Sequence, residues 1–233
     1  HADHVYELFV FIEGNRFDAV NPKHAFGMGS LLHETHRVMD MVRPSFAPAS
    51  EPGTIDLSRL AMLKPIDELL PPGLSADFER IASYAHELSQ ANARPTALVH
   101  GDWHPGNMIY RADTLVAVCD FDNTRVGSRD RELAQALMHA SMIAPSPGQG
   151  GAMVPPEPDP LRLDAFWQGY IRAGGRANAR TIAGLMPGVM IDEALASLGP
   201  SPSEQHGAML TAIWRKAKWL DEHQHALIEQ FAG

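Results

Sequence analysis

Hydrophobic positions along the chain alternate between short strand-like runs and longer stripes with helical spacing. An apolar run over 6–12 contains strand formers and ends at a glycine turn. From Phe26 to Val42 the apolar residues recur at helical spacing, and a second stripe of this kind covers about 75 to 92. Between the two stripes, residues 44–73 are rich in proline and predict a long connection that contains at most one short helical piece. The first part of the chain is therefore expected to fold as strand, helix, connection and helix.

Short strands and then helices are expected in the rest of the chain. The runs TALVH (96–100), NMIY (107–110) and LVAVCDF (115–121) have strand character, and a tight turn at 111–113 joins the last two. Helical periodicity then continues to the end, interrupted by a loop rich in proline and glycine. The later helices are expected over 131–143, 161–173, 179–197 and 203–231. This order indicates an α+β protein that is mainly helical and carries a small β-hairpin.

The amino-acid composition argues against several classes of protein and of binding partner. The chain has 233 residues, 45% of them hydrophobic and 20% charged, enough for a substantial core in one large or two small domains. Its formal net charge of -9, without clusters of Lys and Arg, argues against a nucleic-acid surface. No apolar run is long enough to span a bilayer. The single cysteine, Cys119, excludes an internal disulfide and favours a reducing cytoplasm.

The candidate chemistry lies where apolar runs enclose a polar loop, in the sequence LVHGDWHPGNMIY. His100, Asp102 and Asn107 fall at the spacing H-x-D-x-x-x-x-N, and Asp120 follows at the end of the next strand. In phosphoryl transfer this pattern supplies a base for a hydroxyl nucleophile and oxygen ligands for Mg²⁺. Hard oxygen ligands, one neutral and one charged, suit that ion. The sequence therefore predicts a catalytic loop over 100–107 and a metal-binding hairpin over 107–122.

These motifs also carry a family resemblance. HGDWHPGN together with VCDFD resembles the aminoglycoside phosphotransferase and choline kinase-like family, the small-molecule kinases of the protein-kinase-like fold. The resemblance implies ATP and Mg²⁺ as cofactors, Asp102 as the catalytic base, and Asn107 and Asp120 as Mg²⁺ ligands. It further implies that backbone groups near Val10 and Ile12 bind adenine in the hinge between two lobes.

The same resemblance implies how the chain is divided. Residues 1–14 would form the hinge strand, and residues 15–233 the helical C-lobe with the catalytic loop and the hairpin. The family's N-terminal β-lobe has no counterpart before His1. We therefore expect the chain to be a C-terminal portion that, taken alone, binds nucleotide weakly and transfers little phosphate.

Other polar residues near the motifs have structural or functional interpretations. We expect His100 to be structural, hydrogen-bonding the loop. His104 either braces the loop or lies near the phosphates or the substrate, and Asp122 either contacts metal or substrate or caps the following turn. Glu132 occupies a position where the family usually has Asp, and is expected to brace the catalytic loop with a longer side chain. His33 and His36 are expected on a solvated helix face.

The expected function is ATP-dependent phosphate transfer to a hydroxyl of a small molecule such as an aminoglycoside, choline or homoserine. Helix resumes soon after Asp120 and leaves no activation segment that could dock a protein substrate. The alternative is a catalytically inactive kinase-like module with a binding or regulatory role. The expected partners are nucleotide and a small acceptor, without nucleic acid or membrane, and the oligomeric state stays open. Four acidic positions either favour a cationic acceptor or lie on solvated helix faces: Asp164, Asp192, Glu193 and Asp221.

Overall fold

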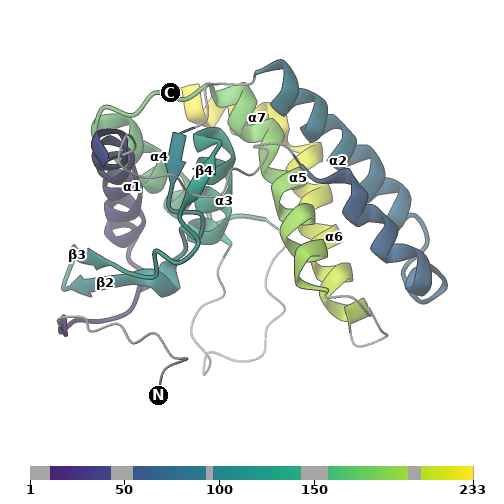
Figure 1. Cartoon of the computed structure of the whole chain (residues 1–233), viewed down its shortest axis with the longest axis horizontal. Coiled ribbons are helices and arrows are strands. Elements are labelled where there is room, and N and C mark those ends of the chain that lie inside the picture. Colours follow the sequence, from purple (N-terminus) through teal and green to yellow (C-terminus); the bar gives the residue numbers. More distant parts are fainter. Residues whose placement is uncertain (1–10, 43–54, 93–96, 143–156, 199–205, 233) are drawn as a thin grey trace, which may run out of the picture.

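The computed structural model describes residues 11–42, 55–92, 97–142, 157–198 and 206–232, and these form a mainly helical α+β structure (Figure 1). The α-helices are α1 (Pro22–Val42), α2 (Leu74–Ala91), α3 (Arg129–Ser141), α4 (Pro160–Arg172), α5 (Ala179–Ser197), α6 (Gly207–Glu222) and α7 (Gln224–Ala232). The 3₁₀ segments are η2 (Leu57–Leu69) and η3 (Pro105–Asn107). The strands are β1 (Ala97–Val99), β2 (Met108–Arg111), β3 (Thr114–Val118) and β4 (Arg125–Gly127).

The described strands form two small antiparallel sheets instead of one. β2 and β3 are the predicted hairpin, with Met108 opposite Val118 and a register shift between Ile109 and Tyr110. β1 pairs with β4, which the sequence did not predict. Because β1 leads into the polar loop and β2 leaves it, the loop is held by one strand from each sheet.

Helix α5 is the centre of the helical core. It is buried almost all round and packs against α2, α3 and α6, which surround it in Figure 1. A helix that is apolar on every face belongs inside the protein. On the other side of the molecule, α1 packs along α4. The hairpin β2–β3 lies near one end of α1 (Figure 1).

Most predicted helices are confirmed within a few residues. The segment expected over 203–231 is instead two helices, α6 and α7, which meet at His223. The proline-rich connection contains η2, a longer 3₁₀ segment than the short piece expected. The strand predicted over 6–12 lies mostly outside the described residues; residues 11–14 have no regular structure, and Asn15 pairs with Tyr110. No helix in the described ranges has the length and hydrophobicity needed to cross a membrane.

Candidate active site

The polar loop between β1 and β2 is closed by hydrogen bonds between its own residues. The side-chain amide Nδ2 of Asn107 donates to the backbone carbonyl of Asp102 at 3.0 Å. His104 caps η3, because its Nδ1 accepts a hydrogen bond from the Gly106 N–H at 2.9 Å. Gly101 has a φ of 84°, and a Cβ there would overlap the Asn123 carbonyl oxygen, so the position requires glycine. The loop therefore has one compact conformation in which Asp102 and Asn107 are neighbours.

His100 joins this loop to the end of the hairpin. Its ring is fully buried, Nε2 lies 3.2 Å from the Cys119 carbonyl oxygen, and Nδ1 accepts from the Asp102 N–H at 3.3 Å. Both contacts are satisfied by the neutral tautomer that carries its proton on Nε2. Burial lowers the pKa of His100, although the neighbouring carboxylates of Glu132, Asp102 and Asp120 act in the opposite direction.

Glu132 connects the loop to two helices. It lies in the first turn of α3, its Oε1 accepts from the Gly101 N–H at 2.6 Å, and its Oε2 lies 2.6 Å from Nε2 of His36 on α1. Both side chains are only 2% exposed. The prediction that His36 lies on a solvated face is therefore wrong. Its position four residues after the buried Leu32, on the apolar stripe of α1, was the signal for burial.

A second brace comes from β4. Arg125 donates from Nη1 to the Gly101 carbonyl oxygen at 3.1 Å. Sequence analysis missed this residue because it did not predict β4. Gly101 is thus held through its N–H by α3 and through its carbonyl by β4.

Asp120 lies two residues after the end of β3, next to Cys119, which contacts Asn107. The Cys119 N–H donates to the Asn107 carbonyl at 3.0 Å, so Asp120 is one residue beyond a direct backbone contact with Asn107. Asp120 has a φ of 65°, in the left-handed region that Asp and Asn tolerate better than most residues. Burial, and secondly the Asp120 charge, raise the pKa of the Cys119 thiol, which disfavours a nucleophilic thiolate.

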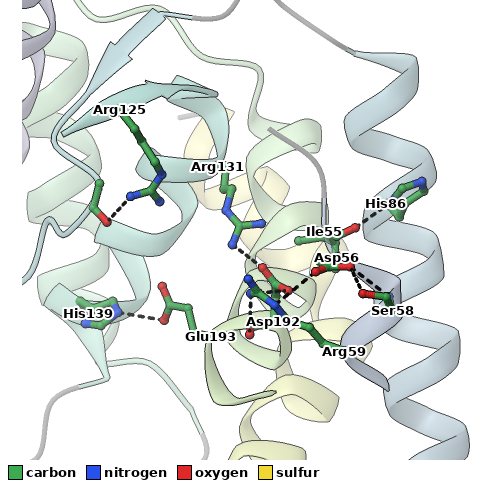
Figure 2. Close-up of polar contacts among 11 residues, drawn as sticks. Ile55, Asp56, Ser58, Arg59, His86, Arg125, Arg131, His139, Asp192 and Glu193 are labelled. Atoms are coloured by element: carbon green, nitrogen blue, oxygen red, sulfur yellow. Dashed lines mark hydrogen bonds and ion pairs between the residues drawn. The ribbon is translucent and has the colours of Figure 1, made fainter. Parts of the chain in front are cut away.

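A chain of polar side chains leads from Asp102 into the helical core. Oδ2 of Asp102 lies 3.5 Å from Nε2 of His104, and the ring of His104 lies 5.9 Å from the ring of His139 on α3. Nε2 of His139 lies 3.1 Å from Oε2 of Glu193 on α5 (Figure 2). Burial acts to lower the pKa of His139. The hydrogen bond and charge of Glu193, together with the charge of Asp102, outweigh this effect of burial, so the pKa of His139 is raised above its usual value.

His139 and Glu193 line a cavity of about 300 Å³ between α3, α5 and α6. Of the four acidic positions considered from the sequence, Glu193 faces this cavity. Asp192 is instead buried between Arg59, at 3.0 Å, and Arg131, and points away from Glu193 in Figure 2. Asp221 pairs with Arg80 at 2.8 Å, and Asp164 is exposed on α4.

The remaining candidate residues are less constrained. Val10 lies outside the described residues, and Ile12 is 39% exposed. Asp122 is exposed in the turn between Asp120 and β4. The nucleotide-binding role of the first pair and the ligand role of Asp122 stay predictions.

The oxygen donors of Asn107 and Asp120 fit a hard divalent cation. Because the amide nitrogen of Asn107 is used within the loop, its Oδ1 is the atom left for a further ligand. No group of three or more His, Cys, Asp or Glu with the geometry to hold a metal occurs among the described residues. A donor set of one amide and one carboxylate suits Mg²⁺, which keeps waters and takes few protein ligands.

The chain is similar to a family of phosphotransferases and to solved phosphotransferase structures. The model of the APH family, described as the phosphotransferase enzyme family, matches residues 1–181. No curated protein matches the chain. Among solved structures, an aminoglycoside phosphotransferase from Alicyclobacillus acidocaldarius superposes with a TM-score of 0.60 at 13% identity, covering 95% of this chain and 70% of that one.

Two kinases of other small molecules are also similar. The amicoumacin kinase hAmiN, in complex with AMP-PNP, Ca²⁺ and Ami, has a TM-score of 0.58 at 16% identity, covering 91% of this chain and 63% of that one. The ethanolamine kinase of Plasmodium vivax has a TM-score of 0.56 at 14% identity, covering 95% and 68%. At such identities the likeness shows the fold, which is that of the protein-kinase-like phosphotransferases.

Proposed function

Because the chain belongs to the phosphotransferase enzyme family, we propose that it transfers the γ-phosphate of ATP to a hydroxyl group of a small molecule. The observation that supports the proposal is that Asn107 contacts both Asp102 and the residue before Asp120. Asn107 contacts Asp102 through its side chain and the strand end before Asp120 through its backbone. These are the residue types and the spacing that phosphoryl transfer uses.

In the proposed reaction the acceptor hydroxyl oxygen forms a bond to the γ-phosphorus. The bond from that phosphorus to the β,γ-bridging oxygen breaks, and ADP leaves with the electron pair. The carboxylate of Asp102 orients the hydroxyl and takes its proton. Much of the rate acceleration comes from positioning, which requires the rigid loop that His100, Glu132 and Arg125 hold.

Asn107 and Asp120 would hold Mg²⁺. When bound, the ion neutralises charge on the nucleotide phosphates. Asn107 is buried, and the hydrogen bond from its Nδ2 to the Asp102 carbonyl orients its side chain, while Asp120 is exposed two residues after β3. For the adenine ring we propose backbone groups near Val10 and Ile12, as the family resemblance implies.

Replacement of the two aspartates tests this proposal. Asp102→Asn and Asp120→Ala should each lower ATP-dependent phosphate transfer by at least about a hundredfold, because each removes a group used in the transition state. The measurement is ATP consumption by the full-length protein over a panel of amino alcohols, sugars and aminoglycosides. Asp113→Asn, an exposed aspartate in the hairpin turn that pairs with Lys23, is the matched control.

The control should retain normal turnover. Turnover close to wild type in Asp102→Asn or Asp120→Ala would reject the proposed roles. Nucleotide binding without turnover on any member of the panel would favour the alternative, a kinase-like module without catalysis.

A further inference from the structure

The cavity next to the candidate active site has walls of unusual composition. Four methionines line it, from α3, its C-cap, α5 and α6: Met138, Met142, Met190 and Met209. We refer to it as the methionine cavity. Methionine side chains are apolar, unbranched and adaptable, so they fit apolar ligands of different shape. The volume of about 300 Å³ is at the lower end of the range for pockets that bind drug-sized molecules.

The cavity lies on the side of α3 from which His139 faces His104, the neighbour of the proposed catalytic base. His139 lies in its wall, and its ring is 5.9 Å from the ring of His104, whose Nε2 is 3.5 Å from the Asp102 carboxylate. The charge of Asp102 also contributes to the raised pKa of His139. The cavity is therefore separated from Asp102 by two imidazole side chains, those of His139 and His104.

The polar atoms of the cavity are few and specific. Oε2 of Glu193 is occupied by His139, but Oε1 of the same carboxylate is buried and has no hydrogen-bond partner among the described residues. A buried oxygen of this kind is costly unless a donor reaches it. Lys216 also lines the cavity, and its burial lowers its pKa. The single unpaired oxygen of Glu193 can take one amine donor, so a ligand with several amines leaves the others without an acceptor of this kind among the described lining residues.

We infer that the methionine cavity binds the acceptor and selects a hydroxyl compound with an apolar body and one amino group, which donates to Oε1 of Glu193, over polycationic aminoglycosides. This inference rests on the proposed function, because Asp102 is taken as the base that receives the hydroxyl proton. The sequence offered four acidic positions as candidates for binding a cationic acceptor, and of these Glu193 lines the cavity. With Asp192 and Asp221 paired to arginines, the described part of the cavity offers one carboxylate to an acceptor.

Calorimetric titration of the full-length protein with small probes tests the inference. Phenylalaninol carries an aromatic ring, one amine and one hydroxyl; 3-phenyl-1-propanol lacks the amine; kanamycin carries several amines on sugar rings. We expect phenylalaninol to bind at least about tenfold more tightly than either, because it alone has both the apolar body and the donor. Tighter binding of kanamycin would overturn the inference.

Variants separate the two contributions to binding. Glu193→Gln should weaken phenylalaninol by about tenfold or more and leave 3-phenyl-1-propanol unchanged, since only the amine depends on the carboxylate. Met209→Gln should weaken both phenyl compounds by introducing a polar group into the wall. Glu229→Gln, an exposed position on α7, is the matched control and should change neither. Equal effects of Glu193→Gln on the two phenyl compounds would overturn the assignment of Glu193.

ATP consumption measured in parallel distinguishes the two proposals. Phenylalaninol binding with the expected variant pattern but without phosphate transfer would support the cavity assignment and contradict the proposed function. Phosphate transfer to kanamycin, with no response to Glu193→Gln, would support the function and overturn the acceptor class.

Discussion

Glu132 shows how a single buried side chain can fix a catalytic loop. Its carboxylate contacts the Gly101 N–H and His36 at the same time. Glu132→Asp shortens the side chain by one methylene, so the carboxylate no longer reaches both partners at once. We expect the free energy of unfolding to fall by about 1 to 3 kcal/mol, because a buried donor or acceptor is left unpaired. Phosphate transfer should fall as well.

Urea denaturation followed by circular dichroism measures this change. Glu34→Asp is the matched control, since Glu34 pairs with Arg37 on the surface of α1. Exposed pairs of this kind contribute little, so the control should change stability by no more than about 0.5 kcal/mol. A Glu132→Asp protein as stable and as active as the control would show that the loop does not depend on the longer side chain.

His100 predicts a specific dependence of stability on pH. Because burial lowers its pKa in the folded state, the unfolded protein binds the proton more readily. The contribution of neutral His100 to stability is complete above the pKa of about 6.5 that it has in the unfolded chain. This contribution is lost as the pH falls toward the lower pKa of the folded protein, with a slope of at most about 1.4 kcal/mol per pH unit. His139, whose pKa is raised, acts with the opposite sign. Protonation of His100 at Nδ1 would also break its bond to the Asp102 N–H.

The contribution of His100 can be isolated with His100→Asn, whose amide oxygen can still accept from the Asp102 N–H. Urea denaturation at pH 7.5 and at pH 5.5 should show a smaller loss of stability for the variant than for the wild type. The other histidines contribute equally to both proteins and cancel in the comparison. An identical pH dependence would mean that His100 does not control acid stability.

We expect replacement of Asp120 to affect phosphate transfer much more than stability. The positive φ of Asp120 is strained for most residues, and glycine adopts it without strain. Glycine also makes the unfolded chain more flexible, which lowers the free energy of unfolding. For Asp120→Gly these effects oppose each other, and we expect the free energy of unfolding to change by less than about 1 kcal/mol. Phosphate transfer should nevertheless be lost. A large loss of stability, measured by thermal unfolding, would contradict this separation.

At the scale of elements, periodicity predicted the long helices and the hairpin because each is determined by local pattern. β4 was missed because it has only three residues and gains its pairing from β1, 30 positions earlier in the chain for the first pair (127 − 97). The break between α6 and α7 was missed because His223 is neither proline nor glycine. Such features depend on tertiary contacts more than on local propensity.

The packing of α1 on α4 depends on two glycines that the periodicity did not single out. A Cβ at Gly169 of α4 would overlap the Phe26 carbonyl oxygen, and one at Gly29 of α1 would overlap the Phe166 carbonyl oxygen. The two backbones therefore approach closely at both positions. Gly169→Ala should lower the free energy of unfolding by about 1 to 3 kcal/mol, because the helices have to separate.

Thermal unfolding is the measurement for this prediction, with Gly207→Ala as the control. Gly207 begins α6 and has open space around the position of a Cβ. Alanine there should leave stability unchanged or raise it slightly. Equal stability of the two alanine variants would contradict the close approach of α1 and α4.

At the scale of the whole molecule, the candidate site was predictable where its residues share one short loop. The spacing of His100, Asp102 and Asn107 is local, and Asp120 follows after a single hairpin. His36 and His139 were not placed at the site, because their partners are on other helices far along the chain. Burial and long-range pairing decide the roles of such residues, and neither is visible in a local motif.

An apolar groove lies between α1, β1 and the turn that precedes β4, and it affects how the protein surface associates. It has a volume of about 440 Å³, and Val38, Val42 and Phe121 at its edge are exposed by 45% each. At pH 7 the formal net charge of -9 keeps copies of the protein apart. Near the pI of about 5.7 this repulsion disappears, and apolar surface is then free to drive association.

We therefore expect self-association near pH 5.7 that depends on the groove, measured by light scattering at pH 5.7 and at pH 7.5. Val38→Lys places a charge in the groove and should suppress the association. Leu161→Lys is the matched control, because Leu161 is 72% exposed on α4, outside the groove, and its replacement changes charge and hydrophobicity in the same way. If the two lysine variants suppress scattering equally, net charge alone accounts for the association, since only Val38 belongs to the groove.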